Sequence, residues 1–376
     1  MANLIQIPMN IVLSILLSIL FVHAYFNRNR KIQVNKIFMW IMGLTSFTLI
    51  LEILSVILNN PDLKQFIILH KMVNLMGFIV APCIPLIGYI FLKEWVNRYR
   101  IEKIKINYIL IVPLIINAMG SLMSYNGIGL FHVTGENVYE RGPLFFILPC
   151  VSYIYFAYSL YFIYKQRKNL TDAELIIFSL FYIVPAVFTV IQLKQAAFLT
   201  TWNSTAIIIV VAYIFMINDQ ANRDSLTGLE NRLSYEHYAQ NLDHKKLNNL
   251  FIVYIDIDDF KSINDRYGHC IGDEAIKEFS KLLVESFPLR HKKLIRLGGD
   301  EFLIVMEKQQ QDKVLSYIQA LIKRVDTYNN LGEKPYKIEF GYDMACYTNN
   351  YNNIYELFDY ADHLMYGQKH SRKGKL

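Results

Sequence analysis

Long apolar runs fill the first part of the chain and disappear from the second. Seven of these runs are close to the roughly 20 residues that a helix needs to cross the hydrocarbon core of a bilayer. The pattern predicts an all-α membrane domain of seven helices over residues 1–217. The expected spans are Leu4–Phe26, Ile37–Leu58, Met72–Leu92, Ile106–Tyr125, Leu144–Tyr164, Leu175–Leu193 and Thr200–Ile217.

In the remainder of the chain the apolar runs are shorter. The pattern there predicts a short linker, 218–223, followed by an α+β domain, 224–376. β-prone runs predict strands, and apolar residues at helical spacing predict helices. The expected strands are Leu250–Ile257, Lys293–Leu297, Phe302–Met306 and Lys337–Ala345, and the expected helices are Gly272–Ser286, Asp312–Tyr328 and Asn353–Lys369.

Composition agrees with this division. The chain has 376 residues, of which 53% are hydrophobic and 19% charged, against about 25% charged in a typical soluble domain. The net charge of +6 is uneven, because residues 1–217 carry +8 and residues 218–376 carry −2. A nucleic-acid-binding protein concentrates basic charge on its soluble domain, so we expect no nucleic-acid partner. Only 17 Gly, 10 Pro and 4 Cys exclude collagen-like repeats, Pro/Gly-rich disorder and a disulfide scaffold.

The basic residues between the spans predict the orientation of the membrane domain. Alternate loops hold 12 Lys and Arg residues on one side and 4 on the other. The N-terminus is therefore expected outside and the C-terminal domain in the cytoplasm, with no cleaved signal peptide, because the first apolar run lacks a basic start and a small-residue cleavage site.

Few residues of the membrane domain carry obvious chemistry. Glu52 lies inside a span, where it is either functional or simply bonded to a neighbouring helix. The loop 126–143 either binds an external ligand or is only a solvated loop. We expect the cysteines to be buried and free of disulfides. Five prolines are expected to kink spans or open cavities between them, although packing alone would also explain them, namely Pro82, Pro85, Pro113, Pro149 and Pro185.

Three clusters of polar residues stand out in the second domain. Asp256 and Asp258 follow a hydrophobic strand and suit a divalent cation, although a polar strand end would look the same. Asn264 and Asp273 can read the donor edge of a guanine, although such residues also make turns. Finally, a Gly-Gly hairpin precedes Asp300, which can face Asp256 across neighbouring strands in two-metal geometry.

These clusters resemble the GGDEF domain of diguanylate cyclases over essentially all of residues 219–376. The similar motifs are DSLTGLENR (224–232), DIDDFKSINDRYGHCIGDE (256–274), GGDEF (298–302) and YADHLMYGQK (360–369). The resemblance implies a nucleotidyl-cyclase or palm-like antiparallel sheet with helices. It also implies a transferase reaction in which two GTP become cyclic di-GMP and two pyrophosphates, with Mg²⁺ or Mn²⁺, two ions per site, as cofactor.

The same resemblance implies roles for individual residues. Asp256, the Ile257 carbonyl and Asp300 look like the metal ligands, and Asp300 or Glu301 would help deprotonate the attacking 3′-hydroxyl. Arg296 is expected to support the hairpin rather than to touch substrate. The residues expected at the substrate are Lys261, Asn264, His269, Asp273, Gly298, Gly299, Lys369 and Lys373.

Two departures from the family pattern matter. Lys373 replaces an arginine in the closing signature, which exchanges a bidentate fork for a point charge. Leu289 and Lys292 occupy the positions of the Arg-x-x-Asp product-inhibition site, so we expect no tight product inhibition of that type.

The resemblance implies a homodimer for catalysis, because each unit holds one GTP. The membrane part more loosely resembles bacterial sensor regions, which places the protein in the bacterial inner membrane with an unknown signal. We expect that signal to change how the last spans pair. Two alternatives remain open: a GTP-binding scaffold without turnover, and a transporter with an accessory domain.

Overall fold

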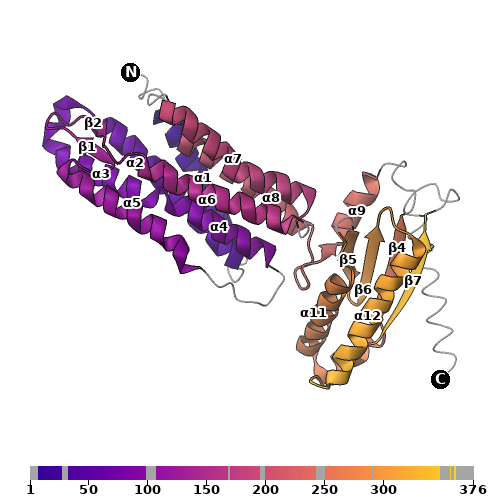
Figure 1. Cartoon of the computed structure of the whole chain (residues 1–376). Helices are drawn as coiled ribbons and strands as arrows, with labels where there is room; N and C mark the ends of the chain where they lie inside the picture. Colours follow the sequence, from indigo (N-terminus) through magenta and orange to yellow (C-terminus); the bar gives the residue numbers. More distant parts are fainter. Residues whose placement is uncertain are drawn as a thin grey trace, which may run out of the picture. The chain divides into compact units, whose positions relative to one another are not determined.

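The computed structural model describes residues 7–27, 33–98, 107–167, 170–194, 200–242, 250–289 and 292–347, together with Glu356 and Tyr360. The chain divides into two units, residues 1–216 and 217–376 (Figure 1). The first unit is helical apart from one small hairpin, and the second combines a sheet with helices. Each unit has its own core, so each is described by itself.

Seven helical segments among the described residues are long and apolar enough to cross a membrane, which agrees with the number predicted. The helices of this unit are α1 (Ile7–Asn27), α2 (Gln33–Leu58), η2 (Pro61–Phe66), α3 (Ile67–Val80), α4 (Cys83–Val96), η3 (Tyr108–Ile111), α5 (Val112–Met123), η4 (Ser124–Asn126), α6 (Ile147–Gln166), α7 (Asp172–Lys194) and α8 (Thr201–Ala221).

The third segment is broken at Pro82 into α3 and α4 and is longer than the expected Met72–Leu92. Proline has no amide hydrogen, so it leaves the carbonyl four residues earlier without its helical donor. That carbonyl belongs to Phe78, and the side-chain amide of Asn117 in α5 donates to it at 2.7 Å. A neighbouring helix thus satisfies the backbone group that the break exposes, as a nonpolar environment requires.

Three further features of this unit bear on what the sequence predicted. Asn10 of α1 donates to the Glu52 carboxylate of α2 at 2.8 Å, which supports the reading of Glu52 as bonded to a neighbouring helix. The loop 126–143 contains an unpredicted antiparallel hairpin of β1 (Phe131–Val133) and β2 (Tyr139–Arg141). The expectation that all cysteines are buried is wrong, because Cys150 and Cys270 are exposed.

The second unit is built on a five-stranded sheet in the order β3-β5-β6-β4-β7. All neighbouring strands are antiparallel except β3 and β5, which are parallel. The strands are β3 (Glu230–Asn231), β4 (Phe251–Ile257), β5 (Lys292–Gly298), β6 (Glu301–Met306) and β7 (Phe340–Cys346), and the helices are α9 (Arg232–Gln240), α10 (Phe260–Tyr267), α11 (His269–Ser286) and α12 (Gln311–Leu331).

β4 is the central element of this unit, and all seven of its residues are buried. Successive side chains of a strand point to opposite faces, so β4 needs cover on both sides. Val253 and Ile255 belong to the cluster that contains residues of α11 and α12, whereas Ile252 belongs to the cluster with Tyr235 of α9. Helices on both faces therefore fix β4 and the polar residues that follow it.

The expected strands and helices of this unit are present with shifted ends, apart from the segment Asn353–Lys369. That segment lies outside the described residues except for Glu356 and Tyr360. β7 begins at Phe340 rather than at Lys337. The reason is that the side chain of Asn329 in α12 occupies both backbone groups of Ile338, accepting from its N–H at 2.9 Å and donating to its carbonyl at 2.7 Å.

Candidate active site

The end of β4 brings two carboxylate-bearing segments together. Asp256 is 4% exposed and stands opposite Glu301 of β6 in the antiparallel register. The amide of Ile257 donates to the carbonyl of Asp300 at 3.2 Å, so the chain after the hairpin is bonded directly to the end of β4. The three expected metal-binding positions, 256, 257 and 300, therefore lie at one end of the sheet.

The hairpin between β5 and β6 presents bare backbone at the same end. Gly298 and Gly299 are exposed, and Gly299 has φ +48°, a conformation that favours glycine. Within the described part of the chain, a Cβ added at either glycine would meet no atom within 4 Å. The space in front of the turn is therefore open to a bound molecule that approaches the backbone closely.

Arg296 supports this turn from inside the unit, as expected. Its Nη2 and Nε donate to the Gly299 carbonyl at 2.7 and 3.0 Å, and its Nη1 donates to Asp224 Oδ1 at 3.0 Å. Thr227 donates to the same carboxylate oxygen through its hydroxyl and its amide. Burial alone would raise the pKa of Asp224, but the hydrogen bonds from Thr227 and Arg296 and the Arg296 charge outweigh it and leave that pKa below its ordinary value.

α10 follows β4 after two residues, and Asp259 at its start has φ +49°. Lys261 is exposed in its first turn, and Asn264 is half-buried one turn later. A Cβ added at Gly272 of α11 would lie 1.9 Å from Asn264 Oδ1, so the absence of a side chain at 272 gives Asn264 its place.

The side chain of Asn264 therefore lies against α11 at Gly272, the residue before Asp273. Asp273 and His269 are both exposed on the first turns of that helix. The two expected guanine readers thus lie on adjoining helices. Two expected phosphate contacts, Lys369 and Lys373, lie outside the described residues.

The described residues contain no group of three or more His, Cys, Asp or Glu side chains arranged to hold a metal ion. The expected site offers fewer protein ligands than that: two carboxylates and one backbone carbonyl. These are hard oxygen donors, which suit Mg²⁺, an ion that usually takes the rest of its ligands from water and substrate phosphates. The donor set therefore fits a magnesium ion that is bound together with a nucleotide.

Lys292, at one of the two positions compared with the product-inhibition site, is turned toward the protein. Its ammonium group donates to the carbonyl of Phe287, and burial lowers its pKa to about 8. A half-buried cation engaged in this way differs in charge and placement from the aspartate of the family pattern. Absence of tight product inhibition stays a prediction.

Two contributions to this site escaped the sequence reasoning. Asp224 was noted only as part of a motif, and nothing local indicates that it bonds Arg296, which lies 72 residues further along the chain. Gly272 was expected only as the first residue of a helix, and not as the residue that makes room for Asn264. A glycine at a buried position of an amphipathic helix is the signal that could have identified this close approach.

Residues 221–375 match the family model described as "Diguanylate cyclase, GGDEF domain". Among curated proteins, the chain is 35% identical over 165 residues to the diguanylate cyclase DgcN of Escherichia coli K12, which covers 42% of this chain and 39% of the relative. It is 29% identical over 158 residues to the diguanylate cyclase DgcS of Shewanella oneidensis, covering 40% and 51%.

It is also 28% identical over 158 residues to the cyclic di-GMP phosphodiesterase PdeR of Escherichia coli K12, covering 42% and 24%. The chain thus spans between about a quarter and a half of these relatives. Among solved structures it is similar to the GGDEF domain of DgcB from Caulobacter crescentus in complex with c-di-GMP, with 21% identity, coverage of 40% and 91%, and a TM-score of 0.37.

Proposed function

We propose that this chain, whose residues 221–375 are a GGDEF domain homologous to diguanylate cyclases, is a membrane-bound diguanylate cyclase. It joins two GTP molecules into cyclic di-GMP and releases two pyrophosphates. The observation that carries the proposal is the meeting of three features at one end of the sheet. They are the buried Asp256, the open Gly298-Gly299 turn, and α10 with Asn264.

Each feature has a task in that reaction. The Gly298-Gly299 backbone lets the triphosphate approach without a side chain in the way, and Lys261 adds positive charge beside the phosphates. Asn264 and Asp273 together offer acceptors for the N1–H and N2–H₂ donors of guanine, which adenine lacks. The site therefore selects GTP over ATP. His269, Lys369 and Lys373 complete the proposed nucleotide contacts.

In the chemical step, the 3′-oxygen of one GTP bonds to the α-phosphorus of the other, and the bond from that phosphorus to pyrophosphate breaks. Asp300 or Glu301 accepts the proton of the hydroxyl. Mg²⁺ or Mn²⁺ ions held by Asp256, Asp300 and the Ile257 carbonyl would neutralise phosphate charge and acidify the hydroxyl. The reaction occurs twice across a homodimer, because each unit holds one GTP.

We further propose that the seven apolar segments span the bacterial inner membrane, with the N-terminus outside and the GGDEF domain in the cytoplasm. The support is their length and the excess of basic residues in alternate loops. A signal received by this region would change how the last spans of two chains pair. Correct orientation of two reactants is worth several kcal/mol of barrier, so pairing geometry is an effective control.

The competing function is a scaffold that binds GTP without turnover. The residues proposed for metal and guanine binding are all of the required types, which favours the enzyme. The same region is similar to a protein named as a cyclic di-GMP phosphodiesterase, so the test must measure the product itself.

The test is to incubate the full chain, reconstituted in nanodiscs, with GTP and Mg²⁺ and to measure cyclic di-GMP. The Asp300→Ala variant should lose the product, whereas Asp312→Asn, which changes an acidic residue of the first turn of α12, should retain it. GTP binding without product at high protein density, where dimers form, would establish the scaffold instead.

A further inference from the structure

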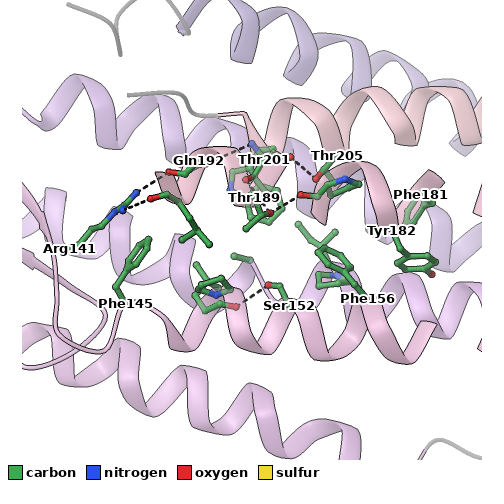
Figure 2. A pocket seen from close by; sticks show the side chains of 18 residues that line it. Arg141, Phe145, Ser152, Phe156, Phe181, Tyr182, Thr189, Gln192, Thr201 and Thr205 are labelled. Carbon is green, nitrogen blue, oxygen red and sulfur yellow. Dashed lines mark hydrogen bonds between the residues drawn. The ribbon is translucent and has the colours of Figure 1, made fainter. Parts of the chain in front are cut away.

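A cavity of about 100 Å³ opens between α4, α6, α7 and α8 in the helical unit. Figure 2 shows Arg141 at one end of it and Tyr182 at the other, with Ser152 and Phe156 of α6 along one wall. One water needs only about 10–15 Å³ of such space, and an engineered cavity of about 150 Å³ binds benzene. This cavity is about two thirds of that size, so it has room for most of one aromatic ring.

Most of the lining is apolar and cannot hydrogen-bond a ligand. Phe145, Phe156 and Phe181 contribute aromatic rings, and Pro85, Pro149 and Pro185 contribute to three of the helical walls. The five prolines were expected either to kink spans or to open cavities between them, and three of the five line this cavity. The apolar part of a ligand would bury most of its surface against these side chains.

The other end of the cavity is positively charged. Arg141 of β2 donates through Nη1 to the Leu193 carbonyl at 3.2 Å and through Nη2 to the Gln192 carbonyl at 3.1 Å. Its guanidinium also lies 4.5 Å from the centre of the Phe145 ring. Its recorded hydrogen-bond acceptors are thus neutral carbonyls at the end of α7.

The charge of Arg141 has no carboxylate partner within ion-pair distance among the residues that the structure describes. Glu140 precedes it in β2, where successive side chains point to opposite faces. A guanidinium has five N–H donors, so three remain after the bonds to the Leu193 and Gln192 carbonyls. The end of the cavity is therefore suited to an anionic acceptor, and a planar carboxylate fits the guanidinium fork best.

We propose that this cavity binds a small amphipathic carboxylate, with its carboxylate at Arg141 and an apolar body of about one ring between α6 and α7. Such a molecule could enter from the solution or, as the head end of a fatty acid, from the bilayer. The binding itself does not depend on the proposed cyclase activity; only its use as a signal rests on the proposed function.

α8 lines this cavity and contains the first residues of the second unit. Thr201, Trp202 and Thr205 line the cavity, and the same helix continues without interruption to Ala221. There the side-chain amide of Asn231 donates to the Ala221 carbonyl at 2.8 Å, while its Oδ1 accepts from the Ser234 amide and begins α9. A ligand that displaces the α8 wall therefore acts on a helix that is bonded to the GGDEF domain at its far end.

The experiment measures binding of radiolabelled benzoate to the full chain in nanodiscs of zwitterionic lipid by equilibrium dialysis. We expect saturable binding with one site per chain, and binding of the neutral benzamide at least roughly tenfold weaker, since it lacks the charge-assisted bond. Arg141→Gln should weaken benzoate binding by a similar factor, and Arg141→Lys should weaken it less. Ser152→Phe, which fills the cavity from α6, should abolish it.

Lys64→Gln is the matched control, because it removes another loop cation that pairs with Glu136 and does not line the cavity. Helical circular dichroism of each variant checks that the unit folds. A second arm places labelled oleate in the bilayer. If oleate binds with the same dependence on Arg141 while benzoate does not, the carboxylate comes from the membrane. Equal binding of benzoate and benzamide, or equal binding of either carboxylate to wild type and Arg141→Gln, would overturn the proposal.

Discussion

Arg296 bonds Asp224 and the open glycine turn at the same time. Its guanidinium is 3.0 Å from the Asp224 carboxylate and 2.7 Å from the Gly299 carbonyl. Asp224 lies three residues after the end of α8, so the first residues of the GGDEF domain are joined to the turn at which the triphosphate is proposed to bind. The shape of the turn consequently depends on the segment that follows α8, the last of the seven candidate membrane spans.

Asp224→Asn should therefore reduce both stability and turnover. The side chains of the pair are only 13% and 21% exposed, so we expect a loss of about 1–2 kcal/mol of unfolding free energy. The measurement is the temperature at which the full chain in detergent stops binding a fluorescent GTP analogue. Arg324→Gln removes an exposed ion pair with Glu285 and should change nothing; an equal effect of both variants would show that the pair has no special role.

The same pair predicts a pH dependence on the acid side. The ordinary pKa of an aspartate is 3.8, and in the folded chain the pKa of Asp224 is lower. The stabilisation is therefore complete above about pH 4 and is lost as the pH falls through the folded pKa. The measurement is again the temperature at which the chain stops binding the fluorescent GTP analogue, now taken at several pH values from 6 to 3. As the pH falls, this temperature should decrease less steeply for Asp224→Asn than for wild type. Parallel curves would contradict this prediction.

Gly298→Ala should separate activity from stability. The added methyl group meets no atom within 4 Å among the residues that the structure describes, so the fold should be unaffected. It enters the space proposed for the triphosphate, and cyclase turnover should fall on the order of 100-fold, the usual cost of misplacing reacting groups. Gly332→Ala is a control for strain: at φ +65° it should cost about 1 kcal/mol of stability, with turnover unchanged at low temperature. Normal turnover in Gly298→Ala would exclude close approach at this turn.

Gly272→Ala should act on substrate recognition through Asn264. The new Cβ would lie 1.9 Å from Asn264 Oδ1 and must displace that side chain. We expect KM for GTP to rise roughly tenfold, the equivalent of one good hydrogen bond, with kcat changed less. Ser280→Ala, which removes a hydroxyl bonded to the Ile276 carbonyl further along α11, should leave KM unchanged. If both variants behave alike, Asn264 does not read the base.

Insertions in α8 should reveal whether helix phase controls the cyclase. Two alanines after Ile217 rotate the following residues by about 200°, whereas seven return them to within about 20° of their original direction. Basal synthesis of cyclic di-GMP in nanodiscs should change several-fold with two and return close to wild type with seven. A Gly/Ser insertion of seven residues matches the length but not the stiffness and should behave differently. Equal activity of all three would rule out transmission through the helix.

The sequence predicted most elements because their signals are local. Seven apolar runs and the β4 run leave few alternatives, and the Gly-Gly pair at 298–299 marks the predicted hairpin. Element ends failed where a distant side chain competes for the backbone. The side chain of Asn329 bonds both the N–H and the carbonyl of Ile338, so β7 begins later than expected. The side-chain amide of Asn117 donates to the carbonyl that would otherwise receive the amide hydrogen that Pro82 lacks.

The site was predictable as a set of residue types but not as a set of contacts. The register that sets Asp256 opposite Glu301 follows from the packing of β4 between two helical layers. The bond between Arg296 and Asp224 joins segments 72 residues apart, and the cavity at Arg141 needs four helices to exist at all. Neither relationship has a spacing that a single segment of sequence could reveal.

No other residue type can easily make both hydrogen bonds of the Asn231 side chain. One amide group donates to the last carbonyl of α8 and accepts from the first turn of α9. Aspartate would keep the acceptor and lose the donor, serine would be too short to span both, and glutamine would shift both atoms by a methylene group. Substitutions that change how α8 leads into α9 are therefore tolerated more readily at neighbouring positions than at this residue, and a library that varies this segment should leave position 231 unchanged.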